Sequence, residues 1–202
     1  MYVMALPRST IGKKVIMALT GLIGVGFLLL HMYGNLKAFL GPEYFNAYAE
    51  GLRSFGSPVL GHLHLLTVIR AVLLVSVVLH IWAALSLTRQ AWHARPTRYA
   101  VKKRVQADYA AVTMRWGGLA IFLFLLYHLA QFTWGTPGVA EDFVRGDAYH
   151  NLVVGFQSVP VTLIYIAAVI ALGFHLYHGG WSLFQTLGMS NDNTEKPLRA
   201  LS

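Results

Sequence analysis

The chain contains no cysteine among its 202 residues. This excludes disulfide bonds, thiolate zinc sites, iron–sulfur ligation by this chain and covalent attachment of haem through a CxxCH motif. Charge is also scarce, because Asp, Glu, Lys and Arg make up 12% of the residues, against roughly 25% in soluble domains. Only 8 residues are acidic, whereas 16 are basic and 56% are hydrophobic. This balance indicates a membrane partner rather than nucleic acid.

Long apolar runs divide the chain into four segments, each close to the roughly 20 residues that a helix needs to cross a hydrocarbon core. Because the segments are continuously apolar and do not alternate, they favour helices over barrel strands. The predicted spans are residues 15–36, 63–87, 116–134 and 159–187. The predicted fold class is therefore all-α, an integral membrane helical bundle with four spans in a single domain over residues 1–202.

The basic residues are distributed unevenly between the loops. Four spans put both termini and the loop between the second and third spans on one side of the membrane. That side carries 12 of the 16 basic residues and three acidic ones. The positive-inside rule therefore predicts a multi-pass protein with both termini in the cytoplasm. The N-terminal stretch lacks the pattern of a cleaved signal peptide, so the first span is expected to be retained.

Nine histidines are present; four lie at or beyond the ends of the predicted spans, and the other five lie in the interior of a span. An ionisable side chain within a span indicates a functional site, although a single one is equally well explained by a hydrogen bond between helices. Because each of the four spans carries at least one histidine, a purely structural explanation is less satisfactory for the set. The five are His31, His80, His128, His175 and His178.

Four of these histidines fall into two depth tiers. At about 1.5 Å per residue from the cytoplasmic boundary, His31 lies roughly 25 Å deep and His128 roughly 20 Å deep. His80 lies roughly 14 Å from the same boundary, and His175 roughly 20 Å or less. We assign His31 and His128 to an outer tier and His80 with His175 to an inner one, although the separation is marginal for His175.

Two imidazoles that face each other from different helices can hold a transition metal, and haem iron is a frequent choice. Haem supplies four nitrogens, so the protein needs only two axial ligands, and the flat macrocycle fits between helices. A zinc site usually has three or four convergent ligands, often carboxylates or thiolates, and a proton relay usually has acidic partners. No predicted span contains Asp, Glu or Cys. Two bis-histidine b haems, one in each tier, are the interpretation that uses all four spans.

Glycines accompany these histidines. Small residues in spans mark helix contacts more often than clearance for a cofactor, and here the two interpretations coincide. The glycines concerned are Gly21, Gly24, Gly26, Gly117, Gly118, Gly173, Gly179 and Gly180.

Four stretches of the sequence carry a family pattern: TIGKKVIMALTGL…LLLHMYGNLKAFLGPEYFNAYAEGLRS, VVLHIWAALSLT, TMRWGGLAIFLFLLYHL and ALGFHLYHGGWSLFQTLG. They resemble the single-chain dihaem cytochrome b anchor of succinate:quinone oxidoreductases, the membrane subunit of succinate dehydrogenase or fumarate reductase. Within this family, the sequence most resembles the actinobacterial-type branch. The resemblance extends over essentially the whole chain, and FHxxxGxWS around His175 is its most specific block.

The resemblance implies two b haems, a quinone, and docking of a flavoprotein and an iron–sulfur subunit on the cytoplasmic side of a bacterial cell membrane. Electrons would pass from the succinate/fumarate couple through these partners to the quinone, for which menaquinone fits this branch. No succinate-oxidising site is expected in this chain. The resemblance further implies that His31 and His128 hold an outer, low-potential haem, and that His80 and His175 hold an inner, high-potential haem.

Two further polar residues in the spans have competing interpretations. His178 is three residues from His175 and about 60° away around the helix. The family block puts the ligand at His175, which leaves His178 for a haem propionate or the quinone head group. Arg70 lies inside the second span and needs a counter-charge. A propionate of the outer haem and the outer lipid headgroups are equally suitable partners for it.

Several partners and alternatives stay open. The family normally has five spans, so a fifth helix is expected to be missing from this sequence or supplied by a small extra subunit. The basic loop between the second and third spans is expected to attract anionic lipid and, on the resemblance, to dock the iron–sulfur subunit, with no role for nucleic acid. The alternative functions are another dihaem membrane cytochrome b and a histidine-lined transporter, which would show no haem absorbance.

Overall fold

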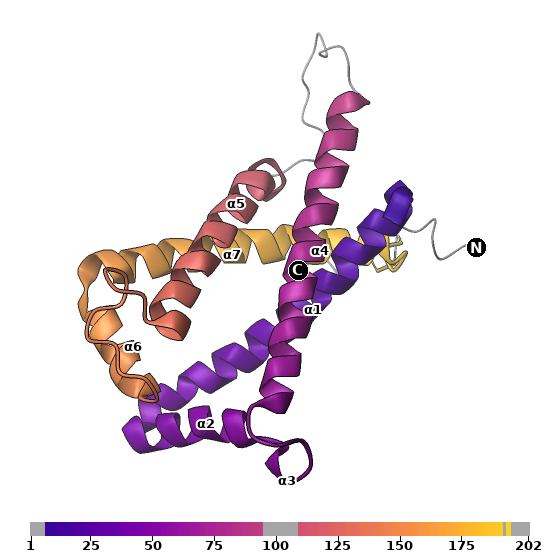
Figure 1. The fold of residues 1–202 in the computed structure, drawn as a ribbon. Coiled ribbons are helices and arrows are strands. Elements are labelled where there is room, and N and C mark those ends of the chain that lie inside the picture. The colour runs from indigo at the N-terminus through magenta and orange to yellow at the C-terminus, as the bar shows by residue number, and fades with distance from the viewer. Residues whose placement is uncertain (1–6, 95–108, 192, 195–202) are drawn as a thin grey trace. The chain divides into compact units, whose positions relative to one another are not determined.

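The structure is a computed structural model that describes residues 7–94, 109–191, 193 and 194. Every regular element within these residues is helical (Figure 1). Four helices are long and apolar enough to cross a membrane, which confirms the predicted all-α membrane fold. They are α1 (Thr10–Leu36), continued by the 3₁₀ turn η2 (Lys37–Leu40); α4 (His64–His93); α5 (Tyr109–Leu129), continued by the π-helical turn η3 (Ala130–Trp134); and α7 (Val159–Thr186).

The long helices expose most of their apolar surface. At most 11% of the most apolar stretch of any of the four is buried within the protein. Large side chains such as Leu30 and Trp116 are 68% and 75% exposed. A contiguous apolar surface of this extent is unstable in water, whereas lipid chains solvate it while the helix satisfies its own backbone. The chain is therefore a multi-pass membrane protein whose apolar helix faces contact lipid.

Shorter helices occupy the connections between the spans. They are α2 (Pro42–Ser54), α3 (Ser57–Leu60) and α6 (Ala148–Gln157). Pro42 begins α2, where its fixed φ and missing N–H cost nothing. Asp147 is the N-cap of α6, and its carboxylate accepts the backbone N–H of His150 at 2.9 Å.

The described residues form two compact units. Unit 1 contains residues 7–29, 68–94 and 178–191 with 193 and 194, and unit 2 contains residues 30–67 and 109–177. In unit 1 the start of α1 packs against the end of α4. The Thr10 hydroxyl donates to Gln90 Oε1 at 3.2 Å, and Lys13 Nζ lies 5.9 Å from the centroid of the Trp82 ring. Lys13 is buried, so its stem is covered by protein while its charge faces an aromatic ring.

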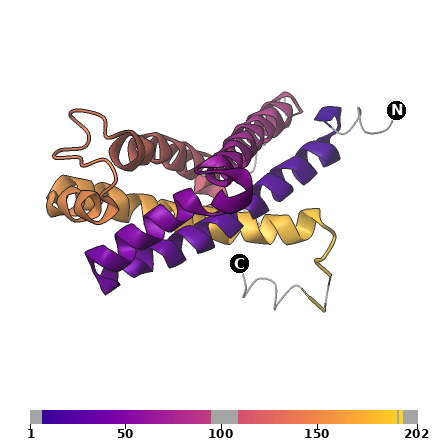
Figure 2. The ribbon, with the colours of Figure 1, turned by 60° about the horizontal axis from the view of Figure 1, so that its bottom comes forward.

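In unit 2, α2 folds back beside the C-terminal end of α1, as Figure 2 shows. The approach is closest at Gly34, where an added Cβ would lie 2.7 Å from Tyr48 Cε1. A larger residue in α1 at this position would have to displace the Tyr48 ring. Helix α2 also contacts α6, where the Asn46 amide donates to Asp147 Oδ1 at 2.9 Å and accepts the backbone N–H of Tyr149 at 2.9 Å.

Candidate functional site: histidines within the spans

In unit 2, His128 of α5 belongs to a hydrogen-bonded chain of three side chains. The Tyr165 hydroxyl donates to Gln131 Oε1 at 3.0 Å. Its single proton is thereby used, so the Tyr165 oxygen can only accept from His128 Nδ1, which lies 3.1 Å away. His128 therefore carries its proton on Nδ1.

In unit 1, the same ring nitrogen of His80 in α4 is hydrogen-bonded to residues of α1. His80 Nδ1 lies 3.1 Å from the backbone carbonyl oxygen of Met17 and 3.2 Å from Thr20 Oγ1. A carbonyl oxygen only accepts, so Nδ1 must be the donor. The Thr20 hydroxyl donates to the carbonyl of Ile16 at 2.7 Å and can accept from His80 in the same way.

Both arrangements put the lone pair of the imidazole on Nε2. This is the usual state of a metal-ligating histidine, whose other ring N–H is donated to a carbonyl or a polar side chain that fixes the tautomer and the ring orientation. The sequence could predict these histidines as ligands but not their tautomer, because the partners lie on other helices. Tyr165, Gln131 and Met17 were therefore missed by sequence reasoning.

His31 and His128 are brought together within unit 2. Their ring centroids lie 5.8 Å apart, and their planes are nearly perpendicular at 89°. Metal–imidazole bonds of about 2 Å place two axial rings on opposite sides of one ion with their centroids roughly 6 Å apart. The spacing of the two rings therefore fits a shared iron, and this outer pair is the one that the depth argument predicted.

An aromatic cluster surrounds His128. The rings of Phe124, Phe132 and Tyr165 lie with centroids 5.7–6.0 Å from that of His128. Phe156 of α6 stacks on Phe132 with ring centroids 6.1 Å apart. These aromatic rings give His128 an apolar environment, with which a bis-histidine haem is compatible.

Glycines lie against the other two predicted ligands. In unit 1, a Cβ on Gly21 would lie 3.4 Å from His80 Cε1, and in unit 2 a Cβ on Gly118 would lie 3.7 Å from His175 Cε1. By contrast, an added Cβ on Gly24, Gly26 or Gly173 would meet nothing within 4 Å. Sequence reasoning grouped these glycines together, whereas the structure separates two that border histidines from three that do not.

The remaining predicted site residues stay as predictions. His80 belongs to unit 1 and His175 to unit 2, so the proposed inner pair is untested by the geometry within either unit. His178 is half-buried in unit 1, and Arg70 in α4 is exposed. Among the residues that the structure describes, no group of three or more His or acidic side chains is placed to hold a metal ion.

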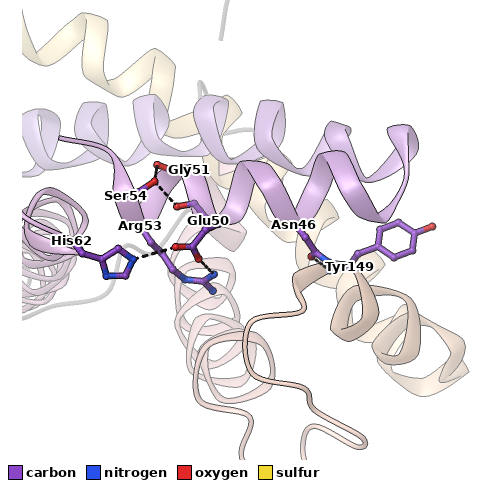
Figure 3. A network of polar contacts seen from close by, with 7 residues as sticks. All are labelled: Asn46, Glu50, Gly51, Arg53, Ser54, His62 and Tyr149. Carbon is purple, nitrogen blue, oxygen red and sulfur yellow. Dashed lines mark hydrogen bonds and ion pairs between the residues drawn. The ribbon is translucent and has the colours of Figure 1, made fainter. Parts of the chain in front are cut away.

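A separate polar network joins the connecting segments of unit 2 (Figure 3). Glu50 accepts from Arg53 at 3.1 Å and from His62 Nε2 at 3.2 Å. The His62 hydrogen bond and then the Arg53 guanidinium hold the pKa of the Glu50 carboxyl below its usual value. The network links α2 to the segment that leads into α4. Its residues are exposed or only partly covered, and they form no catalytic arrangement.

Most of the basic loop predicted to dock a partner, residues 95–108, lies outside the described residues, as do Lys196 and Arg199. Comparisons with protein-family models, with curated proteins and with solved structures found no match.

Proposed function

We propose that this chain is the dihaem cytochrome b anchor of a succinate:quinone oxidoreductase. The observation that carries the proposal is the shared state of His80 and His128. Each lies within a span and donates Nδ1–H to a partner on another helix, which leaves Nε2 to coordinate. A transporter path lined by histidines has no need to fix the same tautomer twice.

The proposed ligand pairs follow the two tiers. His31 and His128 would hold the outer haem, for which the 5.8 Å centroid distance supports a shared iron. His80 would hold the inner haem with His175, and Gly21 and Gly118 would leave room for the two rings. When bound, haem supplies one-electron transfer. The residues of the chain orient the axial rings, exclude water and line the macrocycle with apolar side chains.

Within the proposed complex, the chain would pass electrons from an iron–sulfur subunit to a membrane quinone, for which the resemblance alone suggests menaquinone. A flavoprotein subunit would carry the succinate site. The basic residues are concentrated on the side predicted to carry both termini, and the positive-inside rule supports a cytoplasmic location for that side. The partner subunits would therefore dock on the cytoplasmic face of a bacterial cell membrane. Quinone reduction takes two electrons and two protons, so polar groups near a haem edge would complete the reaction.

The direct test is the haem content per polypeptide of the purified complex, from reduced-minus-oxidised spectra. We expect about two b haems in the native protein and about one in the His31→Ala variant. His93→Ala is the matched control, because this exposed histidine ends α4 outside the paired sites and should leave both haems in place.

Absence of haem from the native preparation would overturn the proposal and favour the transporter. Two haems that succinate fails to reduce in the intact complex would favour another dihaem cytochrome b instead. Two haems that succinate reduces, with one lost in His31→Ala and none in His93→Ala, would support both the function and the outer ligand pair.

A further inference from the structure

The chain of hydrogen bonds behind His128 extends away from the metal-facing side of the ring. It runs from His128 Nδ1 in α5 to the Tyr165 hydroxyl in α7, and then to Gln131 Oε1 in η3. Neither Tyr165 nor Gln131 is a ligand, yet together they decide how strongly the imidazole N–H is bound. Deeply placed polar side chains of this kind are rare in membrane spans and indicate a function.

Gln131 is held firmly in this arrangement. It is only 3% exposed, the least accessible polar side chain of those described. It lies on the π-helical turn η3, and such turns inside helices frequently mark functional sites. A Cβ added to Gly155 of α6 would lie 2.8 Å from the Gln131 side-chain nitrogen. The glycine therefore makes room for the amide, whose oxygen accepts from Tyr165 at 3.0 Å.

The orientation of the amide determines the polarity of the whole chain. With Oε1 toward Tyr165, the tyrosine proton points to Gln131 and its oxygen accepts from His128. With the amide reversed, its NH₂ would donate to Tyr165, whose proton would then point to His128. His128 would in that case need its lone pair on Nδ1, which is incompatible with a ligand at Nε2.

We propose that Tyr165 and Gln131 are positioning residues that lower the reduction potential of the haem held by His31 and His128. The inference rests on the proposed function. A hydrogen bond from Nδ1–H to an acceptor increases the basicity of the ligating imidazole. A more basic axial ligand stabilises ferric iron over ferrous iron, so the potential of that haem falls.

The test is a redox titration of both haems in the purified complex carrying Tyr165→Phe. Loss of the acceptor should shift the midpoint potential of one haem upward and leave the other unchanged. Tyr127→Phe is the matched control. Its ring lies 6.4 Å from that of Tyr165 between centroids, and its hydroxyl makes no hydrogen bond among the described residues. It should leave both potentials as they are.

Gln131→Leu provides a second, independent variant. It leaves Tyr165 as an acceptor but removes the group that polarises it, so the upward shift should be smaller than that of Tyr165→Phe. Loss of one haem in Tyr165→Phe while Tyr127→Phe retains two would also support the positioning role. The retained haem reports a folded chain, and the hydrogen-bond partner of a metal ligand controls the affinity of the site.

Two results would overturn the inference without affecting the proposed function. One is a native complex with two haems whose potentials are unchanged in both Tyr165→Phe and Gln131→Leu. The other is a shift of equal size in Tyr127→Phe, which would show a general response of the aromatic cluster. A native complex without haem would instead remove the proposed function itself.

Discussion

The imidazole rings of His31 and His128 stand nearly perpendicular, at 89°, with their centroids 5.8 Å apart. Each axial imidazole raises the energy of one iron dπ orbital, so perpendicular rings raise both and leave them nearly degenerate. For the oxidised complex we therefore predict that the haem proposed to lie between His31 and His128 gives a low-spin ferric signal of large anisotropy. This signal is measurable by electron paramagnetic resonance at low temperature.

The assignment of that signal can be checked with the ligand variants. His31→Ala should remove it and leave the signal of the second haem in place. If the oxidised complex shows only the less anisotropic signals of parallel axial rings, the ring arrangement described for His31 and His128 is wrong for the haem-bound protein.

Gly21 and Gly24 lie on the same helix but differ in what they face. A Cβ on Gly21 would lie 3.4 Å from His80 Cε1, whereas one on Gly24 would meet nothing within 4 Å. We predict that Gly21→Leu displaces the His80 ring, at an overpacking cost of about 1–3 kcal/mol. The haem content should then fall toward one per chain. Gly24→Leu is the control and should retain two haems; equal losses in both variants would refute the clearance role of Gly21.

Thr20 is a secondary acceptor for His80, because the Met17 carbonyl also accepts from the same nitrogen. Thr20→Val should therefore raise the potential of the inner haem only slightly. The loss of haem affinity should lie near the lower end of the roughly 10–100-fold range that follows when a hydrogen-bond partner of a metal ligand is changed. Thr20→Ser keeps the hydroxyl and should behave as the native protein in the same titration. A large shift in Thr20→Val would show that the Met17 carbonyl is not an effective acceptor.

The sequence was sufficient to predict the all-α membrane fold and its four spans, because continuous apolar runs in lipid leave few options for the backbone. It also predicted that His31 and His128 belong together, since depth along a helix follows from counting residues. The helices extend beyond the predicted spans at several ends. Helix α1 begins at Thr10 and α4 continues to His93, because polar and basic residues prolong a helix past its apolar stretch.

The interhelical partners could not be predicted. Whether Gly21 or Gly24 faces a histidine depends on the rotation of α1 about its axis and on which helix packs against it. The role of Gln131 depends on a π-helical turn, for which Ala130–Trp134 carries no recognisable signal. Sequence patterns therefore predicted the candidate ligands, while their tautomers and supporting residues came only from the packing.

Asp147 caps α6 with an ionised carboxylate outside the spans. The backbone N–H of His150 and then the Asn46 side chain hold its pKa below the ordinary value. Because the folded state holds the proton less tightly, the cap stabilises α6 fully above the ordinary pKa of about 3.9. That contribution is lost as the pH falls below this value and through the lower folded pKa. We predict that hydrogen exchange at the His150 amide, corrected for the intrinsic rate, loses protection only in this acidic range.

Asp147→Asn separates the charge from the hydrogen bonds of this cap. Asparagine is an equally good N-cap residue and keeps an oxygen that accepts from His150, but it does not titrate. Protection of α6 in this variant should therefore be independent of pH across the range where the native protein loses it. Asp147→Ala should expose the His150 amide at every pH, since its acceptor is removed, whereas the Tyr149 amide keeps its own acceptor, Asn46 Oδ1, at 2.9 Å. If Asp147→Asn loses protection in acid just as the native chain does, another group controls the pH dependence.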